Sequence, residues 1–142
     1  MPTPKQSPGF SLVELLLVLA IIGIISIIAV PQFMGQRRRA RVIGDAQANT
    51  RILAMALETR RGDTGTYAAS GKVVTWTGGV ANDSTFLPTL ILKNNTKMNY
   101  VVSVNNAGLG YQITVKDPFV GSAVVLKAIQ TGSIKLDSTY NK

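Results

Sequence analysis

The chain has 142 residues, a formal net charge of +8, and neither cysteine nor histidine. This length suits one small domain with one accessory segment and leaves little room for a multidomain enzyme. Without those two residue types there is no disulfide, no thiolate nucleophile, and no side chain that titrates near neutral pH, so we expect a protein that is not an enzyme.

The first nine residues form a polar, proline-rich segment that precedes a long apolar one. Three prolines within eight positions oppose a helix there. A secretory signal has its small-residue cleavage site after the apolar region, whereas here the obvious break, Pro8-Gly9, comes before it. We therefore expect residues 1–9 to be a leader whose removal leaves the apolar segment attached.

The apolar segment runs from Phe10 to Val30 and carries a single charge, on Glu14. About 20 such residues in a helix cross the ~30 Å hydrocarbon layer of a membrane. We predict a transmembrane helical half over residues 10–34. Pro31 lacks the N–H group for its helical hydrogen bond, and Gly35 has a low helix propensity. A kink is therefore expected between them.

Residues 35–61 read as a second, amphipathic half of the same helix. Apolar or small side chains recur there at spacings of three and four residues and so share one face: Ile43, Ala46, Thr50, Leu53 and Leu57. Gly62 is the expected stop.

Residues 62–142 are expected to form a β-rich globular head. Short β-branched or aromatic runs lie at residues 72–77, 99–104, 111–116 and 123–130, with a hairpin loop at 105–110. Asp117-Pro118 ends the third run, and residues 62–98 are expected to be an irregular loop with one short strand. The predicted fold class is α+β, with one long N-terminal helix packed on an antiparallel sheet of three or four strands.

The run Gly9-Phe10-Ser11-Leu12-Val13-Glu14, followed by the apolar stretch and Pro31, resembles the N-terminus of type IV pilins and of type II secretion pseudopilins. The resemblance implies the type IV pilin fold. It also implies cleavage between Gly9 and Phe10 by a prepilin peptidase, with N-methylation of the new Phe10 amine.

Glu14 is a lone carboxylate in the apolar segment, where a charge costs about 2.5 to 3.5 kcal/mol. After processing, the nearest cation is the amine of Phe10. The resemblance implies that Glu14 meets this amine on a neighbouring subunit during assembly. The alternative is that Glu14 only reaches the membrane interface, being four residues into the segment. We favour the assembly role.

These features together predict a structural subunit that assembles into a helical pilus, or into a pseudopilus for type II secretion. The expected partners are copies of itself, the prepilin peptidase, the inner-membrane assembly platform, and other minor pilins or pseudopilins. Before assembly the subunit would span the bacterial inner membrane once, with its head in the periplasm, and the filament would lie in the periplasm or on the cell surface. The short head without cysteine favours a pseudopilin or a minor pilin, since many pilins close a C-terminal loop with a disulfide.

Arg37, Arg38, Arg39 and Arg41 form a basic cluster just beyond the apolar segment. They are candidates for binding an anionic partner, and the alternative function is a DNA-binding minor pilin of a competence or type IV pilus system. The cluster conflicts with the expected orientation, because the positive-inside tendency would place it in the cytoplasm. We expect the orientation of the family.

The acidic residues of the head are widely spaced, and no Asp-x-Asp cluster occurs among them. We therefore expect turn and surface roles, with no metal and no cofactor, for Asp63, Asp83, Asp117 and Asp137.

Overall fold

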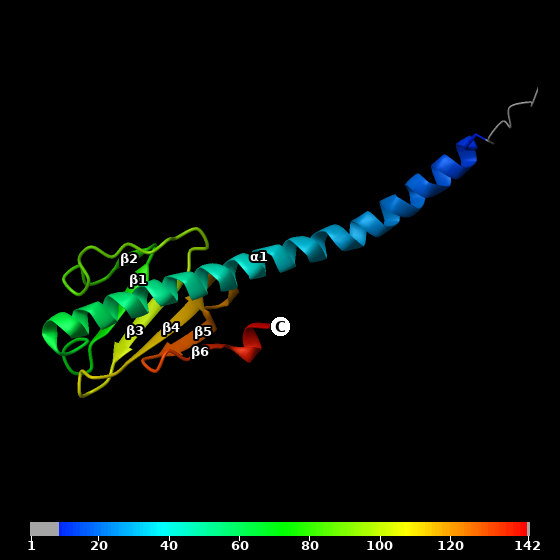
Figure 1. Cartoon of the computed structure of the whole chain (residues 1–142). Coiled ribbons are helices and arrows are strands. Elements are labelled where there is room, and N and C mark those ends of the chain that lie inside the picture. The colour runs from blue at the N-terminus through cyan, green and yellow to red at the C-terminus, as the bar shows by residue number, and fades with distance from the viewer. Residues whose placement is uncertain (1–8, 142) are drawn as a thin grey trace, which may run out of the picture. The chain divides into compact units, whose positions relative to one another are not determined.

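The computed structural model describes residues 9–141, so the expected leader lies almost entirely outside the described residues. The chain divides into two compact units, Met1–Arg39 and Ala40–Lys142, and each is described by itself. One helix, α1, spans Leu12–Thr64 and contributes to both units (Figure 1).

Within the first unit, α1 is a regular helix that contains Pro31 and continues through Gly35. The bend expected between these two residues stays a prediction. The side chains from Leu12 to Val30 are all exposed in the isolated chain. An 18-residue window of α1 has a mean hydropathy of 3.0, which makes the helix long and apolar enough to cross a membrane.

Helix α1 ends at Thr64, three residues beyond the expected boundary. Gly62, the expected stop, is helical, and the chain leaves the helix at Gly65, whose φ is +79°. The N–H of Gly65 donates a 2.8 Å hydrogen bond to the carbonyl of Arg61, which is the left-handed ending that glycine favours.

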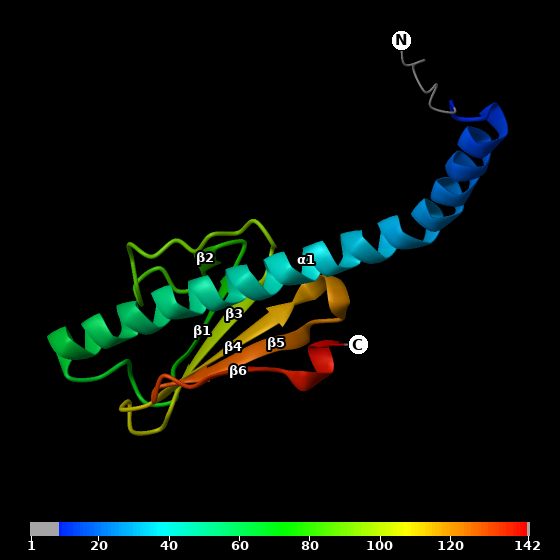
Figure 2. The same cartoon turned by 45° about the vertical axis from the view of Figure 1, so that its right-hand side comes forward.

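The second unit contains a six-stranded antiparallel sheet in the order β2-β1-β3-β4-β5-β6, with the later half of α1 along one face (Figure 2). The strands are β1 Val73–Thr77, β2 Val80–Ala81, β3 Asn99–Val104, β4 Tyr111–Asp117, β5 Ala123–Ile129 and β6 Ile134–Leu136. Two short 3-10 helices, η1 at Pro118–Val120 and η2 at Ser138–Asn141, follow β4 and β6. The α+β fold class is confirmed.

The sheet has six strands, whereas three or four were expected, because the sequence pattern did not indicate two short edge strands. In the first case, Thr77 pairs with Val80, so Gly78 and Gly79 form a two-residue hairpin loop. Both glycines have positive φ, as such a loop requires. In the second, β6 has three residues, a length too short for an alternating pattern to stand out.

The core of this unit lies between α1 and the inner face of the sheet. Every second residue of β3 and β4 is buried against the helix, and the buried positions of α1 are Val42, Ala46, Asn49, Thr50, Leu53 and Leu57. Trp76, Tyr67 and Tyr100 are the largest fully buried side chains. The expected apolar stripe of the second helical half is thus confirmed at four of its five positions, and Ile43 is half-buried.

Candidate functional site

The first turn of α1 forms a capping box between Ser11 and Glu14. The Ser11 hydroxyl accepts a 3.2 Å hydrogen bond from the N–H of Val13, and Glu14 Oε2 accepts a 2.9 Å hydrogen bond from the N–H of Ser11. Two N–H groups that a helix start leaves without partners are thereby satisfied. The carboxylate also lies at the positive end of the helix dipole, which lowers the free energy of a negative charge there.

This arrangement gives Ser11 a role that our sequence reading missed. The signal was present, because serine followed three residues later by glutamate, just before an apolar run, is the sequence pattern of a capping box. In the sequence, Glu14 stands out by its charge alone. The structure shows that this carboxylate also closes the end of its own helix.

Gly9 and Phe10, the residues of the expected cleavage site, precede α1 and are exposed. Phe10 is 85% exposed, and a Cβ added to Gly9 would meet no atom within 4 Å. The Gly9–Phe10 bond therefore lies in exposed, non-helical chain directly before the capping box. The expected cleavage at this bond and the N-methylation of Phe10 remain proposals.

The expected anion-binding arginines occupy consecutive turns of α1. Arg37, Arg38 and Arg41 are exposed, and Arg39 is half-buried. The guanidinium of Arg37 lies 5.7 Å from the ring centroid of Phe33, one turn earlier, which is a cation-π distance. Part of this cluster therefore has a contact within its own helix.

Three of the head aspartates use their oxygens for local turns, as expected. Asp83 Oδ1 accepts from the N–H and hydroxyl of Thr85, and Asp137 Oδ1 accepts in the same way from Thr139. These hydrogen bonds lower the pKa of Asp137, and the contact with Lys72 together with Thr85 lowers the pKa of Asp83.

Asp117 is fully buried and caps η1. Its Oδ1 accepts from the N–H of Phe119, and its Oδ2 accepts a 2.7 Å hydrogen bond from the Tyr140 hydroxyl. Over residues 9–141, no three acidic side chains come together in a way that could hold a metal ion.

Comparison with known proteins adds one finding to this geometry. Residues 4–30 match the family described as the prokaryotic N-terminal methylation motif, and this range includes residues 4–9 of the expected leader, the Gly9–Phe10 bond, Glu14 and the apolar segment. No solved structure matches the chain. The motif indicates a structural subunit, and the α+β fold agrees with the type IV pilin fold. The motif and the fold together support a type IV pilin-like subunit of the kind that prepilin peptidase processes.

Proposed function

We propose that this subunit polymerises into a helical filament whose centre is made of the apolar halves of α1, and that the filament is the pseudopilus of a type II secretion system or a closely related pilus. The observation that carries the proposal is the apolar run from Leu12 to Val30, exposed along its whole length and carrying one carboxylate. A surface of this kind has to be covered by lipid or by protein.

Burial of apolar side chains supplies the free energy for replacing contacts with lipid by contacts with other subunits. Each large aliphatic side chain that leaves water contributes about 1.5 to 3 kcal/mol, so a helix that has left the bilayer is strongly driven to pack on copies of itself. Identical subunits related by a rotation and a rise form heterologous contacts that do not close. Such contacts generate a helical filament.

Glu14 would set the register of this packing. Its Oε2 is held by the N–H of Ser11, while Oε1 accepts no hydrogen bond from residues 9–141. The processed amine of Phe10 on a neighbouring subunit is the cation that we propose for Oε1. The capping box would then hold the carboxylate in place before the partner arrives.

The experiment separates the two roles of Glu14. Glu14→Gln keeps a capping side chain but loses the charge, whereas Glu14→Ala loses both. If charge pairing drives assembly, both variants lose filaments, measured by shearing and electron microscopy, while inserting normally in the membrane. Filaments of normal number in Glu14→Gln would contradict the charge-pairing role and leave capping as the function of this residue.

We further propose that the head faces the periplasm and that Arg37, Arg38, Arg39 and Arg41 meet anionic groups of the assembled machine. Because the chain has no cysteine, a single Ser138→Cys substitution in the exposed η2 segment gives a unique label site. A membrane-impermeant maleimide should label it in intact spheroplasts. Labelling only after lysis would place the head in the cytoplasm, as the positive-inside tendency predicts.

The choice between a secretion pseudopilus and a pilus is tested in cells that lack the gene. Loss of an exported enzyme from the medium, with unchanged surface filaments, is the result expected for a type II secretion subunit. Loss of surface filaments with normal secretion would assign the subunit to a pilus.

A further inference from the structure

The head carries an exposed aromatic side chain on the short helix η1. Among residues 40–141, Phe119 is the only aromatic residue that is exposed, at 62%, and Val120 beside it is also exposed. We call these two residues the aromatic tip. Single exposed apolar residues are common on protein surfaces, so the way in which this pair is held decides its meaning.

The aromatic tip is held in place from both sides. Asp117, which is fully buried, accepts from the N–H of Phe119 through Oδ1 and from the Tyr140 hydroxyl through Oδ2. Directly after the tip, Gly121 and Ser122 have φ values of +58° and +59° and turn the chain back into β5. A positive φ is unfavourable for serine, so the fold tolerates strain to keep this turn. A side chain presented on such a preorganised turn loses little conformational entropy on binding.

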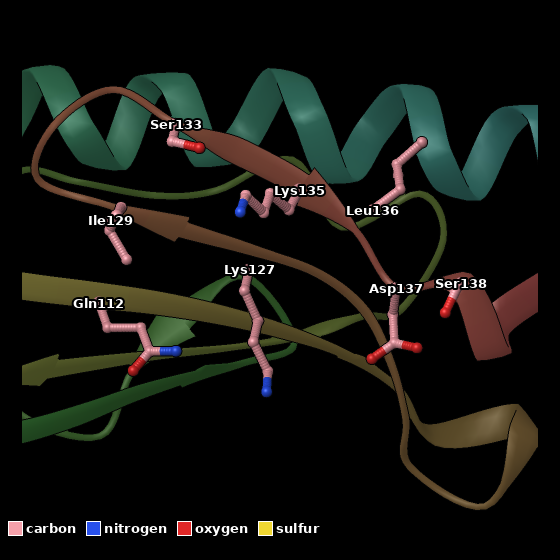
Figure 3. A pocket seen from close by; sticks show the side chains of 8 residues that line it. All are labelled: Gln112, Lys127, Ile129, Ser133, Lys135, Leu136, Asp137 and Ser138. Atoms are coloured by element: carbon pink, nitrogen blue, oxygen red, sulfur yellow. The ribbon is translucent and has the colours of Figure 1, made fainter.

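Two hollows border the hairpin of β5 and β6, and they differ in chemistry. One, of about 420 Å³, has Lys127, Lys135 and Asp137 in its lining, so it carries charges of both signs (Figure 3). The other, of about 440 Å³, lies between α1 and the hairpin and is mainly apolar. We call it the apolar hollow, and its lining includes Arg51, Ala54, Met55, Tyr111, Ala128 and Ile134.

The lining of the apolar hollow suits an aromatic side chain. Met55 is 72% exposed and brings a thioether, a group that contacts aromatic rings favourably. Arg51 is exposed and brings a guanidinium, which can lie over the face of a ring. The volume falls in the range in which proteins hold small ligands, so a phenylalanine side chain has room there.

The aromatic tip and the apolar hollow lie at opposite ends of strand β4. Tyr111, in the lining of the hollow, begins this strand, and the tip follows Asp117, which ends it. The seven residues of β4 span about 20 Å, so a subunit cannot place its own tip in its own hollow. A contact between two copies would join two different surfaces, and such a heterologous contact repeats without closing.

We propose that the aromatic tip of one subunit inserts into the apolar hollow of the next, with Phe119 as the anchor and with Met55 and Arg51 against its ring. An aromatic anchor that fills a pocket supplies a large share of the binding free energy of an interface. This inference rests on the proposed filament and adds to it a contact between heads, which is separate from the packing of the apolar halves of α1.

Cysteine pairs test the contact directly, because the chain has no cysteine of its own. The test variant is Met55→Cys/Phe119→Cys. The matched control is Ile91→Cys/Phe119→Cys, since Ile91 is 78% exposed and lies outside the hollow. Sheared filaments are treated with a short bismaleimide, and the products are separated by denaturing electrophoresis. Fluorescence of the buried Trp76 in the extracted subunits verifies that each variant is folded.

We expect the test pair to give a ladder of trimers and longer products, because each subunit offers both partners of a head-to-tail contact. The control pair should give few products beyond the monomer. Equal ladders for the two pairs, or no ladder from filaments of normal number, would overturn the contact while leaving the filament in place. Absence of filaments in the wild type would instead contradict the proposed function itself.

A second measurement compares filament yield in Phe119→Ala and Ile91→Ala. Loss of the anchor should lower the yield on the order of tenfold, whereas Ile91→Ala should leave it nearly unchanged. Equal yields in the two variants would overturn the proposal. Slow reaction of Phe119→Cys with a maleimide in membrane-inserted subunits that have not assembled would also overturn it, because lipid would then cover the tip.

Discussion

Asn49 of α1 donates a 2.8 Å hydrogen bond from Nδ2 to the hydroxyl of Tyr100 on β3, and the same amide group donates to the carbonyl of Lys93, also at 2.8 Å. Asn49 is 1% exposed and Tyr100 is 2% exposed. One buried amide thus joins the helix, the central sheet and the loop that precedes β3. Burial raises the pKa of Tyr100, so this phenol keeps its proton and can donate to the carbonyl of Asp45, 3.5 Å away, while it accepts from Asn49.

Asn49→Ala should destabilise the head by about 1 to 3 kcal/mol, because two acceptors in a buried region lose their donor. The measurement is urea unfolding of the full chain followed by the fluorescence of Trp76, the single tryptophan. Gln47→Ala, at a half-buried position of the same helix, is the control and should leave the midpoint nearly unchanged. Equal midpoints for the two variants would show that the Asn49 contacts add no stability.

Ser11→Ala should loosen the first turn of α1 while leaving the charge of Glu14 in place. Loss of a capping hydroxyl costs about 1 kcal/mol, which corresponds to roughly fivefold faster opening. Amide hydrogen exchange at Val13, measured by NMR in micelles, reports this directly because its N–H is the donor to Ser11 Oγ. Ser11→Thr keeps the hydroxyl and should exchange slowly. Slow exchange in both variants would contradict the cap.

Gly108, in the β3–β4 hairpin loop, should tolerate no side chain. Its φ is +70°, and an added Cβ would lie 2.6 Å from the carbonyl oxygen of Ala68. The Gly108 carbonyl also accepts a hydrogen bond from the N–H of Tyr67, so the loop cannot move away freely. We expect Gly108→Ala to lower the free energy of unfolding by about 3 kcal/mol or more, by urea unfolding.

Gly121→Ala is the control that isolates backbone strain. Gly121 has a φ of +58°, and an added Cβ there would meet no atom within 4 Å. Its substitution should cost about 1 to 2 kcal/mol from the left-handed conformation alone. Equal effects for the two glycines would mean that the close approach to Ala68 is relieved by movement of the loop.

The sequence predicted the parts of this molecule that follow one dominant physical pattern. Periodicities of 3.6 and two residues located α1 and the four longer strands, and β3 agrees with its predicted bounds. The 105–110 loop and the end of β4 at Asp117 were also predicted correctly. In each case local propensity and burial favour the same conformation, so a single sequence is sufficient.

The features that the sequence did not predict depend on contacts that leave no periodic pattern in it. Asn49 interrupts an apolar stripe, and only the fold shows that its partners are Tyr100 and Lys93. Lys127 and Lys135 are neighbours only through the register of β5 and β6, which no periodicity predicts. The Ser11 cap and the Gly78-Gly79 hairpin loop, by contrast, carried recognisable local signals that a closer reading would have used.

Lys135→Gln should stabilise the head, since it removes one member of the Lys127–Lys135 cross-strand pair. The expected gain is about 0.2 to 1 kcal/mol at low salt, and it should shrink as salt screens the repulsion. Urea unfolding at two salt concentrations measures it, and Lys93→Gln, on an exposed loop position, should change stability little. A loss of stability in Lys135→Gln would show that the two ammonium groups do not repel in the folded chain.

Tyr111 should make the head sensitive to alkali. Burial, with a further contribution from the nearby Glu58 carboxylate, raises the pKa of Tyr111 from 10.0 to about 12. The folded state therefore holds the neutral phenol more tightly than the unfolded state does. The resulting stability is fully present below pH 10 and is lost as the pH rises from 10 through about 12, since the unfolded chain releases the proton first.

Tyr111→Phe removes this proton, so the free energy of unfolding should fall less steeply over that pH window. Urea unfolding at a series of alkaline pH values gives the slope for each protein. Some slope should remain in the variant, because the pKa of Tyr100 is also raised by burial. Tyr111 packs edge-on against Tyr67 with ring centroids 4.8 Å apart, and phenylalanine keeps that packing, so a changed slope reports the titration and not lost contacts. Identical slopes for the two proteins would show that Tyr111 titrates equally in the folded and unfolded chains.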